Sequence, residues 1–159
     1  MSGTDVPEEH RRYWRYRREL AAVSAEAETE LVTTVLHDED TVMAVAAIVE
    51  YFDRRAAQLI PGNNAHFDRW ASTMSELAAG HDFLIRRLRE WTLLQSITLG
   101  HKWSPAEILT ATDWFQRKAA ATATAPDVLA LLAEQGRTRR VRNATELRRR
   151  NRGANPQPS

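Results

Sequence analysis

The sequence predicts an all-α protein, either a compact bundle or a short right-handed stack of about six to seven helices. Three observations predict this fold class. Apolar residues recur three and four positions apart along most of the chain, which is the spacing of one face of an α-helix. No segment alternates apolar and polar residues as a half-buried β-strand does. Capping and turn-forming residues separate the periodic segments by only a few positions, so the connections are short.

The length and composition fit one folded domain. We expect residues 1–150 to form a single α-helical domain and residues 151–159 to form a disordered tail. The chain has no cysteine, which excludes disulfides, thiolate nucleophiles and cysteine-based zinc sites. It has neither the layout of a secretory signal nor an apolar run long enough to span a membrane, so the expected location is cytoplasmic.

The first helix begins near Pro7, and its apolar spacing continues to about Leu36 with a bend near Ser24. Its start carries a candidate surface patch, which consists of Arg12, Tyr13, Arg15 and Tyr16. One interpretation is a basic and aromatic surface that stacks on bases or on partner side chains. The alternative is an amphipathic helix whose aromatic rings dock on the core while the arginine stems cover its edge.

The clearest helix follows the segment His37-Asp38-Glu39-Asp40. These side chains lack the spacing of a metal site, and capping by Asp40 or Thr41 is the interpretation that we adopt. From Val42 to Leu59 the apolar residues alternate steps of three and four, and the turn residues 61–64 end the helix.

Residues 83–99 are apolar on more than one face, which is typical of a helix buried on several sides. We expect this to be the central helix, with Asp82, Arg86 and Glu90 along its solvated strip. The preceding helix, residues 65–79, continues in phase with it, so Gly80 should mark a kink or a tight junction. The predicted structural core consists of Val45, Val49, Phe52, Leu84, Leu88, Trp91 and Phe115.

Three further helices are expected in the last third of the chain. The segment Ser104-Pro105-Ala106-Glu107 has the pattern of a capping box and begins a helix that continues to about Ala119. The next helix begins near Pro126 and ends at Gly136. A last, basic helix should run from about 139 to 150, docked through Val141, Ala144 and Leu147.

Two segments, residues 28–59 and 128–147, resemble HEAT-type repeats. In the first, Asp38 and Asp40 occupy the turn, and small Ala46 and Ala47 lie in the second helix. The second segment is similar in outline but lacks the turn Asp, and residues 60–127 show no such repeat. HEAT repeats are stacked helical hairpins, so the resemblance implies a surface that binds a partner protein.

No segment of the sequence contains a motif that identifies a reaction. The motifs GxSxG, HExxH, GxGxxG and the Walker loop are absent, and no two of the five histidines are three or four positions apart. We therefore predict no catalytic residue, no metal ligand and no cofactor, and we predict that the protein is not an enzyme.

Basic charge is concentrated toward the C-terminal end. Residues 1–80 carry 8 basic and 14 acidic side chains, whereas residues 81–159 carry 14 and 7. The helices around Gly136 are similar in outline to a DNA-reading helix-turn-helix, but Leu132 and Arg142 do not fit its register. The candidate contacts with nucleic acid or an acidic partner are Arg137, Arg139, Arg140, Arg142, Arg148, Arg149, Arg150 and Arg152.

Two functions are therefore carried forward as hypotheses. The first is a non-enzymatic α-helical interaction module that binds another protein, as the repeat resemblance and the missing catalytic motifs indicate. The second is a nucleic-acid-associated protein that contacts phosphates through the arginine-rich C-terminal helix and tail. No membrane association is expected.

Overall fold

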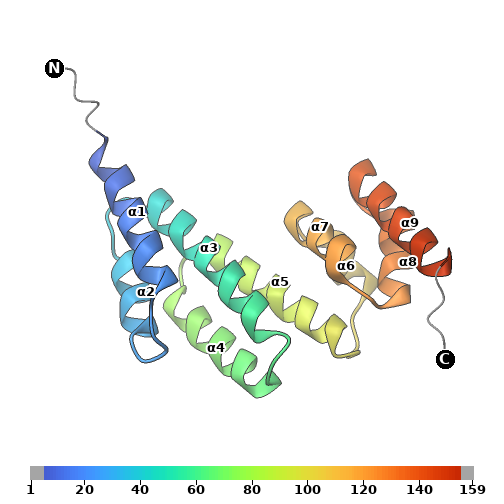
Figure 1. Ribbon diagram of the computed structural model, residues 1–159, viewed down its shortest axis with the longest axis horizontal. Coiled ribbons are helices and arrows are strands. Elements are labelled where there is room, and N and C mark those ends of the chain that lie inside the picture. The colour runs from blue at the N-terminus through green and yellow to red at the C-terminus, as the bar shows by residue number, and fades with distance from the viewer. Residues whose placement is uncertain (1–5, 155–159) are drawn as a thin grey trace. The chain divides into compact units, whose positions relative to one another are not determined.

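The computed structural model describes residues 6–154, and within this range the chain forms nine α-helices and no β-strand (Figure 1). The helices are α1 (Glu8–Ala21), α2 (Glu28–Leu36), α3 (Thr41–Leu59), α4 (Asn64–Leu77), α5 (Asp82–Thr98), α6 (Pro105–Thr110), α7 (Asp113–Thr122), α8 (Pro126–Gln135) and α9 (Arg139–Ala154). The predicted all-α class is confirmed. The expected number of helices is too low because two segments predicted as single helices are each divided.

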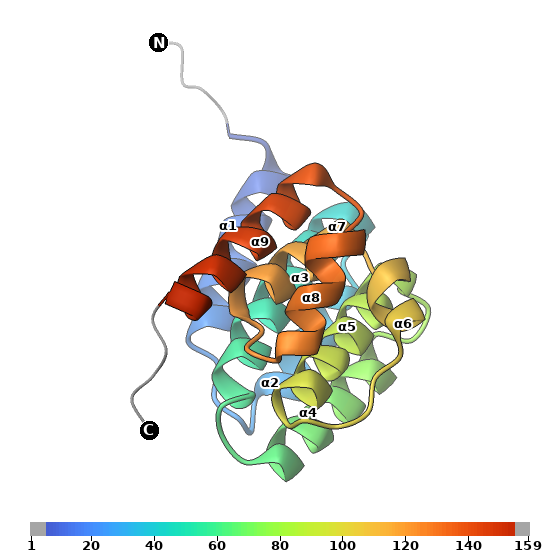
Figure 2. The same cartoon turned by 90° about the vertical axis from the view of Figure 1, so that its right-hand side faces the viewer.

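The chain divides into two compact units that meet inside α5, between Arg89 and Glu90. In the first unit α3 packs against α1, α2 and α4, and α2 also packs against α1 and α4. In the second unit α9 packs extensively against α8 and also against α7, while α6 packs on α7 and α8 (Figure 2). The first unit is therefore built around the long helix α3, and the second around the packed pair α8 and α9.

The first divided segment separates α1 from α2. Residues 22–27 are not helical, and the amide of Ala27 donates to the carbonyl and the hydroxyl oxygen of Ser24. A continuous helix over residues 8–36 would be about 43 Å long, whereas the 19-residue helix α3 is about 28 Å long. Folding back at Ser24 lets both α1 and α2 cover α3, so the expected bend is a complete break.

The second divided segment separates α6 from α7. Ala111 and Thr112 both have φ −65° and ψ 162°, which is extended backbone. The amide of Thr112 donates to Glu90 Oε2 at 2.8 Å, and the hydroxyl of Thr112 accepts the amide of Phe115, which caps α7. Glu90 is only 7% exposed, so it does not lie on a solvated strip as the sequence predicted. Its carboxylate instead accepts the amide of Thr112, at the break between α6 and α7.

Five of the seven predicted core residues are buried, namely Phe52, Leu84, Leu88, Trp91 and Phe115. Val45 and Val49 are only half-buried, and Val42 is 82% exposed. The buried side of α3 instead carries Ala44, Ala47, Ile48, Tyr51 and Phe52. Helix α3 is apolar on two neighbouring faces, and the packing of α1, α2 and α4 decides which of them is covered.

The helix boundaries agree with the local signals in the sequence. Asp40 accepts the amide of Met43 and caps α3, and Ser104 forms a capping box with Glu107 at the start of α6. Gly80 has φ 90° and lies in a tight junction between α4 and α5.

The last helix differs from its prediction in length and in docking. Helix α9 extends to Ala154, beyond the expected end at Arg150, and residues 155–159 of the predicted tail lie outside the described residues. Of its three expected docking residues, only Val141 is buried; Leu147 is 60% exposed, and Thr145 is buried in its place.

Candidate interaction surfaces

The predicted patch on α1 is divided between the interior and the surface. Arg12 donates through Nε and Nη2 to the two carboxylate oxygens of Asp38, each at 3.1 Å, and the Tyr16 hydroxyl donates to the same carboxylate at 2.8 Å. The amide of Asp40 also donates to Asp38, at 2.9 Å. Arg12 and Tyr16 therefore attach α1 to the turn before α3, and Tyr16 is buried.

These contacts change the acidity of the groups involved. The amide of Asp40, the Tyr16 hydroxyl and the Arg12 guanidinium hold the pKa of the Asp38 carboxyl below its usual range, against the opposite effect of burial. Burial and the hydrogen bond to Asp38 raise the pKa of Tyr16. Asp38 is therefore ionised at neutral pH, and the cluster has a structural role: it attaches α1 to the turn before α3.

Tyr13 has a similar structural role on the adjacent side of α1. Its hydroxyl donates to Glu50 of α3 at 3.3 Å, and Arg17 donates to the same carboxylate through Nε at 3.1 Å. The Arg17 guanidinium also stacks on the ring of Trp14, with 4.8 Å from Cζ to the ring centroid. Trp14 is 57% exposed, so its ring is held from one side and presented to solvent on the other.

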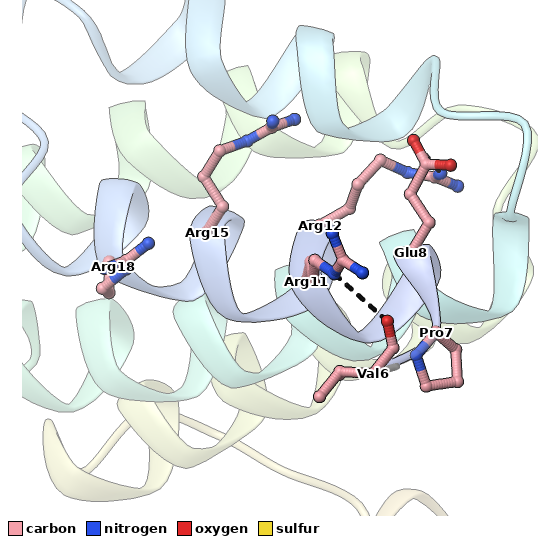
Figure 3. A pocket seen from close by; sticks show the side chains of 7 residues that line it. All are labelled: Val6, Pro7, Glu8, Arg11, Arg12, Arg15 and Arg18. Atoms are coloured by element: carbon pink, nitrogen blue, oxygen red, sulfur yellow. Dashed lines mark hydrogen bonds and ion pairs between the residues drawn. The ribbon is translucent and has the colours of Figure 1, made fainter. Parts of the chain in front are cut away.

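The exposed side of α1 carries Arg11, Arg15 and Arg18, spaced by four and three residues and therefore on one face. With Trp14 we call this the α1 arginine face. Its three arginines line an open cleft of about 670 Å³, together with Val6, Pro7, Glu8 and Arg12. Figure 3 shows Arg11, Arg15 and Arg18 following one another along the helix, with Arg11 Nε donating to the Val6 carbonyl at 3.1 Å.

The four residues selected from the sequence for this patch leave out Arg11, Trp14 and Arg18, although a signal was present. Tyr13, Tyr16 and Leu20 form one helical stripe, and the three arginines form another on the opposite side. Because the two stripes lie on opposite sides of the helix, the helical spacing alone assigns one stripe to the core and the arginines to the surface.

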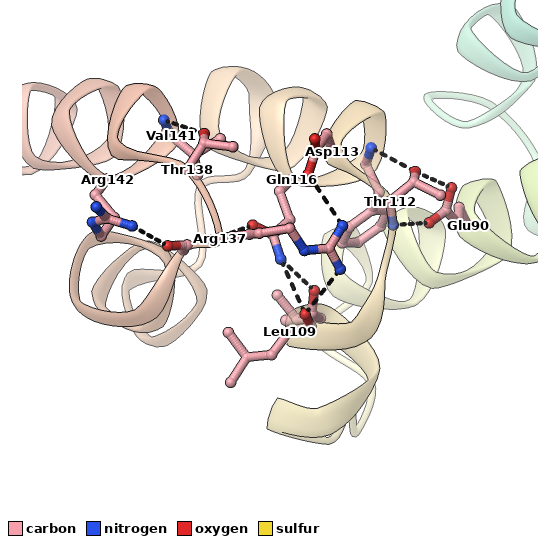
Figure 4. Close-up of polar contacts among 12 residues, drawn as sticks. Glu90, Leu109, Thr112, Asp113, Gln116, Arg137, Thr138, Val141 and Arg142 are labelled. Carbon is pink, nitrogen blue, oxygen red and sulfur yellow. Dashed lines mark hydrogen bonds and ion pairs between the residues drawn. The ribbon is translucent and has the colours of Figure 1, made fainter.

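Half of the eight C-terminal arginines are used to cap helices within the second unit. Arg137 donates to Asp113 at 3.1 Å and to the carbonyl of Leu109 at 3.3 Å, near the end of α6 (Figure 4). Three others donate to carbonyls at or just beyond the C-terminal ends of α7 and α8, namely Arg142 to Gly136, Arg148 to Ala120 and Arg152 to Thr124. Cationic side chains stabilise such unpaired carbonyls, so these four have a structural role.

The other four arginines lie away from these caps. Within residues 6–154, the side chains of Arg139 and Arg140 form no hydrogen bond or ion pair, and both residues are exposed. Arg149 and Arg150 share the carboxylate of Glu146, each at 3.5 Å. The helical spacing places Arg139, Arg140, Leu147 and Arg150 on the side of α9 opposite to the buried Val141 and Thr145. We call these four residues the α9 outer face.

Gln116 connects the end of α6 to the loop before α9. It is fully buried, and its Nε2 donates to the carbonyl of Ile108 at 3.1 Å. Its Oε1 accepts the amide of Arg137 at 2.8 Å (Figure 4). Together with the Glu90 contact to Thr112, this hydrogen bonding fixes the α6–α7 corner under the α8–α9 hairpin. Arg142, which fails the helix-turn-helix register, folds back onto Gly136.

A buried carboxylate occupies the first unit. Glu28 of α2 accepts hydrogen bonds from the Tyr51 hydroxyl of α3 and from Trp70 Nε1 of α4, the latter at 3.2 Å. Arg55 Nε lies 3.5 Å from the same carboxylate. Burial, followed by the hydrogen bond to Glu28, raises the pKa of Tyr51 well above its usual value, so Tyr51 remains a hydrogen-bond donor. This cluster joins three helices.

No group of three or more His, Asp or Glu side chains within residues 6–154 is placed to hold a metal ion. In the segment 37–40, His37 Nδ1 contacts the carbonyl of Thr33 at 2.7 Å, while Asp38 and Asp40 form the contacts described above. Among the described helices, none combines the length and the apolar character needed to cross a membrane.

Comparison with protein-family models, with curated proteins and with solved structures finds no significant match to this chain.

Proposed function

We propose that this protein is a non-enzymatic helical interaction module, and that the α1 arginine face binds an acidic segment of another protein. The observation that carries the proposal is the exposed Trp14 beside Arg11, Arg15 and Arg18 on one helix, where the three arginines line an open cleft. Tryptophan and arginine are the residue types most enriched among the energetically dominant residues of protein interfaces. Guanidinium groups also pair with carboxylates through two parallel hydrogen bonds.

The surroundings of Trp14 favour binding because they order the surface in advance. Arg17 is itself paired with Glu50 and stacks on the Trp14 ring, so the ring loses little side-chain entropy when a partner covers its other side. Arg12 is paired with Asp38, so the contact with the partner is formed by Arg11, Arg15 and Arg18.

The repeat resemblance supports the same class of function. Residues 28–59 include the paired helices α2 and α3, and residues 128–147 lie within the paired helices α8 and α9. We propose that these hairpins are HEAT-like, a type of structure that presents helical faces to partners.

The test uses a fluorescein-labelled acidic peptide made of Asp, Glu and Leu, followed by fluorescence anisotropy. We expect binding that weakens with salt and is lost in Trp14→Ala and in Arg15→Glu. Arg117→Glu in α7 is the matched charge-reversal control, because Arg117 is exposed on a different helix, and it should bind as the parent does. Absence of binding, or binding that both α1 variants retain, would contradict the proposal.

A capture experiment from a nuclease-treated lysate complements the peptide assay. Proteins retained by the parent chain and lost with Trp14→Ala would carry the expected acidic segments. Association with nucleic acid is the competing proposal, and it now relies on four arginines instead of eight, since the other four cap helices.

A further inference from the structure

A shallow groove lies in the first unit where α1 ends and α2 runs beside it. The groove has a volume of about 300 Å³, and its apolar lining comes from Val23, Ala27 and Leu31. Glu19 and Glu30 complete the lining together with Thr34. Glu30 is exposed and forms no ion pair within residues 6–154. We call this the α1–α2 groove; it is an apolar depression with an acidic border.

The α9 outer face has the complementary composition. Leu147 is 60% exposed, although leucine is among the residues most often buried. Arg150 follows it by one helical turn and Arg140 precedes it by two, so the two guanidinium groups flank the leucine along a stretch of about 15 Å. Helices α7 and α8 pack against α9, and the residues buried there, Val141 and Thr145, lie on its opposite side.

We propose that copies of this chain associate head to tail, with the α9 outer face of one copy docked in the α1–α2 groove of the next. Leu147 enters the apolar groove between Val23 and Leu31, while Arg140 and Arg150 pair with Glu19 and Glu30. The inference goes beyond the proposed function, because it uses neither the cleft nor Trp14.

The distribution of charge selects a second copy as the occupant. Residues 1–80 carry an excess of acidic side chains and residues 81–159 an excess of basic ones, so the unlike halves of two copies attract and the like halves repel. The two surfaces differ, which makes the contact heterologous; each copy that docks leaves one groove and one α9 outer face open. The assembly therefore grows with protein concentration and is weakened by salt.

The test is sedimentation velocity on the full chain after nuclease treatment, over a range of protein and salt concentrations. We expect the weight-average mass to rise with protein concentration at low salt and to return to the monomer mass at high salt. Glu30→Arg removes the groove contact and Leu147→Asp removes the α9 contact, so each variant alone should remain monomeric. Both residues are exposed, and circular dichroism should show unchanged helix content.

An equimolar mixture of the two variants identifies the head-to-tail geometry. Glu30→Arg retains an intact α9 outer face and Leu147→Asp retains an intact groove, so the mixture should form dimers of one copy each that cannot grow further. A symmetric α9-to-α9 contact would instead leave Glu30→Arg self-associating and the mixture without new dimers. Glu134→Arg in α8 is the matched control for charge and should associate as the parent does.

Three results would overturn the proposal. The first is a parent chain that stays monomeric at all concentrations, and the second is a Glu30→Arg variant that still self-associates. The third is a monomeric chain that retards duplex DNA with a slope of log K against log salt of about −3.6, the value for four arginines on phosphates. That slope would assign the exposed arginines of α9 to nucleic acid.

Discussion

The carboxylate of Glu90 accepts both the backbone amide of Thr112, at 2.8 Å, and its hydroxyl, at 2.7 Å. The two residues are 22 positions apart, and their contact lies at the break between α6 and α7.

Replacing Glu90 by Ala should lower the free energy of unfolding by about 1–3 kcal/mol, since a partly buried amide is left without an acceptor. Urea denaturation measures the loss. Glu90→Gln should lose less, and Glu134→Ala, on the exposed side of α8, should change stability by less than about 0.5 kcal/mol. An unchanged Glu90→Ala variant would mean that water replaces the carboxylate.

Trp91 and Trp14 should respond oppositely to the same substitution. Trp91 is 3% exposed and packs edge to face on Trp114 with 5.3 Å between ring centroids. Trp91→Ala should destabilise the protein by about 3–5 kcal/mol, the range for emptying a large aromatic site. Trp14→Ala should change stability by less than about 0.5 kcal/mol while abolishing peptide binding. A loss below about 1 kcal/mol for Trp91→Ala in urea would contradict the core assignment.

The capping box at α6 predicts a small, local effect. Ser104 Oγ accepts the amide of Glu107 at 3.4 Å, a long hydrogen bond on an exposed helix end. Ser104→Ala should therefore cost about 0.5–1 kcal/mol, the lower part of the range for such caps. Ser104→Asp should restore most of that loss, because Asp is an equally good N-cap. A variant that keeps its stability but loses partner binding would give Ser104 a role in recognition.

Asp38 predicts a dependence of stability on acid pH. Because its pKa is lower in the folded chain than in the unfolded chain, its stabilisation is complete above about pH 4, the ordinary range for Asp. That stabilisation is lost as the pH falls through the lower folded-state pKa. The stability difference between the parent and Asp38→Asn should therefore be largest near neutral pH and shrink below pH 4. Asp68→Asn, an exposed change on α4, should show no such trend in urea melts across the same pH series.

Gly136 predicts a steric effect at the α8–α9 turn. A Cβ atom there would lie 2.5 Å from the carbonyl oxygen of Leu132 and 2.9 Å from Val141 Cγ1. Gly136→Ala should therefore destabilise by about 1–3 kcal/mol, as overpacking does. Gly153→Ala is the matched control: nothing lies within 4 Å of its Cβ position, and the helical site should gain up to about 1 kcal/mol. Equal thermal stability of the two variants would exclude a close approach at Gly136.

Much of the helical architecture could be read from local signals. The caps at Asp40 and Ser104 and the break at Gly80 depend on interactions within one turn of the chain, and each lies where the sequence predicts. The buried stripe through Leu84, Leu88 and Trp91 follows from helical spacing in the same way. By itself, the sequence determined the helical class and most helix starts, because backbone propensity, capping and periodicity act over a few residues.

Only the tertiary structure decided which surfaces are free. The break before α7 depends on Glu90, and the covered face of α3 depends on α1, α2 and α4. In the sequence the C-terminal arginines are alike; in the fold Arg148 reaches the carbonyl of Ala120, 28 residues away, while Arg139 and Arg140 remain exposed. These outcomes depend on which groups meet across helices. The spacing of apolar residues predicts which residues tend to be buried. It does not predict which helix buries them, or which backbone carbonyl accepts a hydrogen bond from a given arginine.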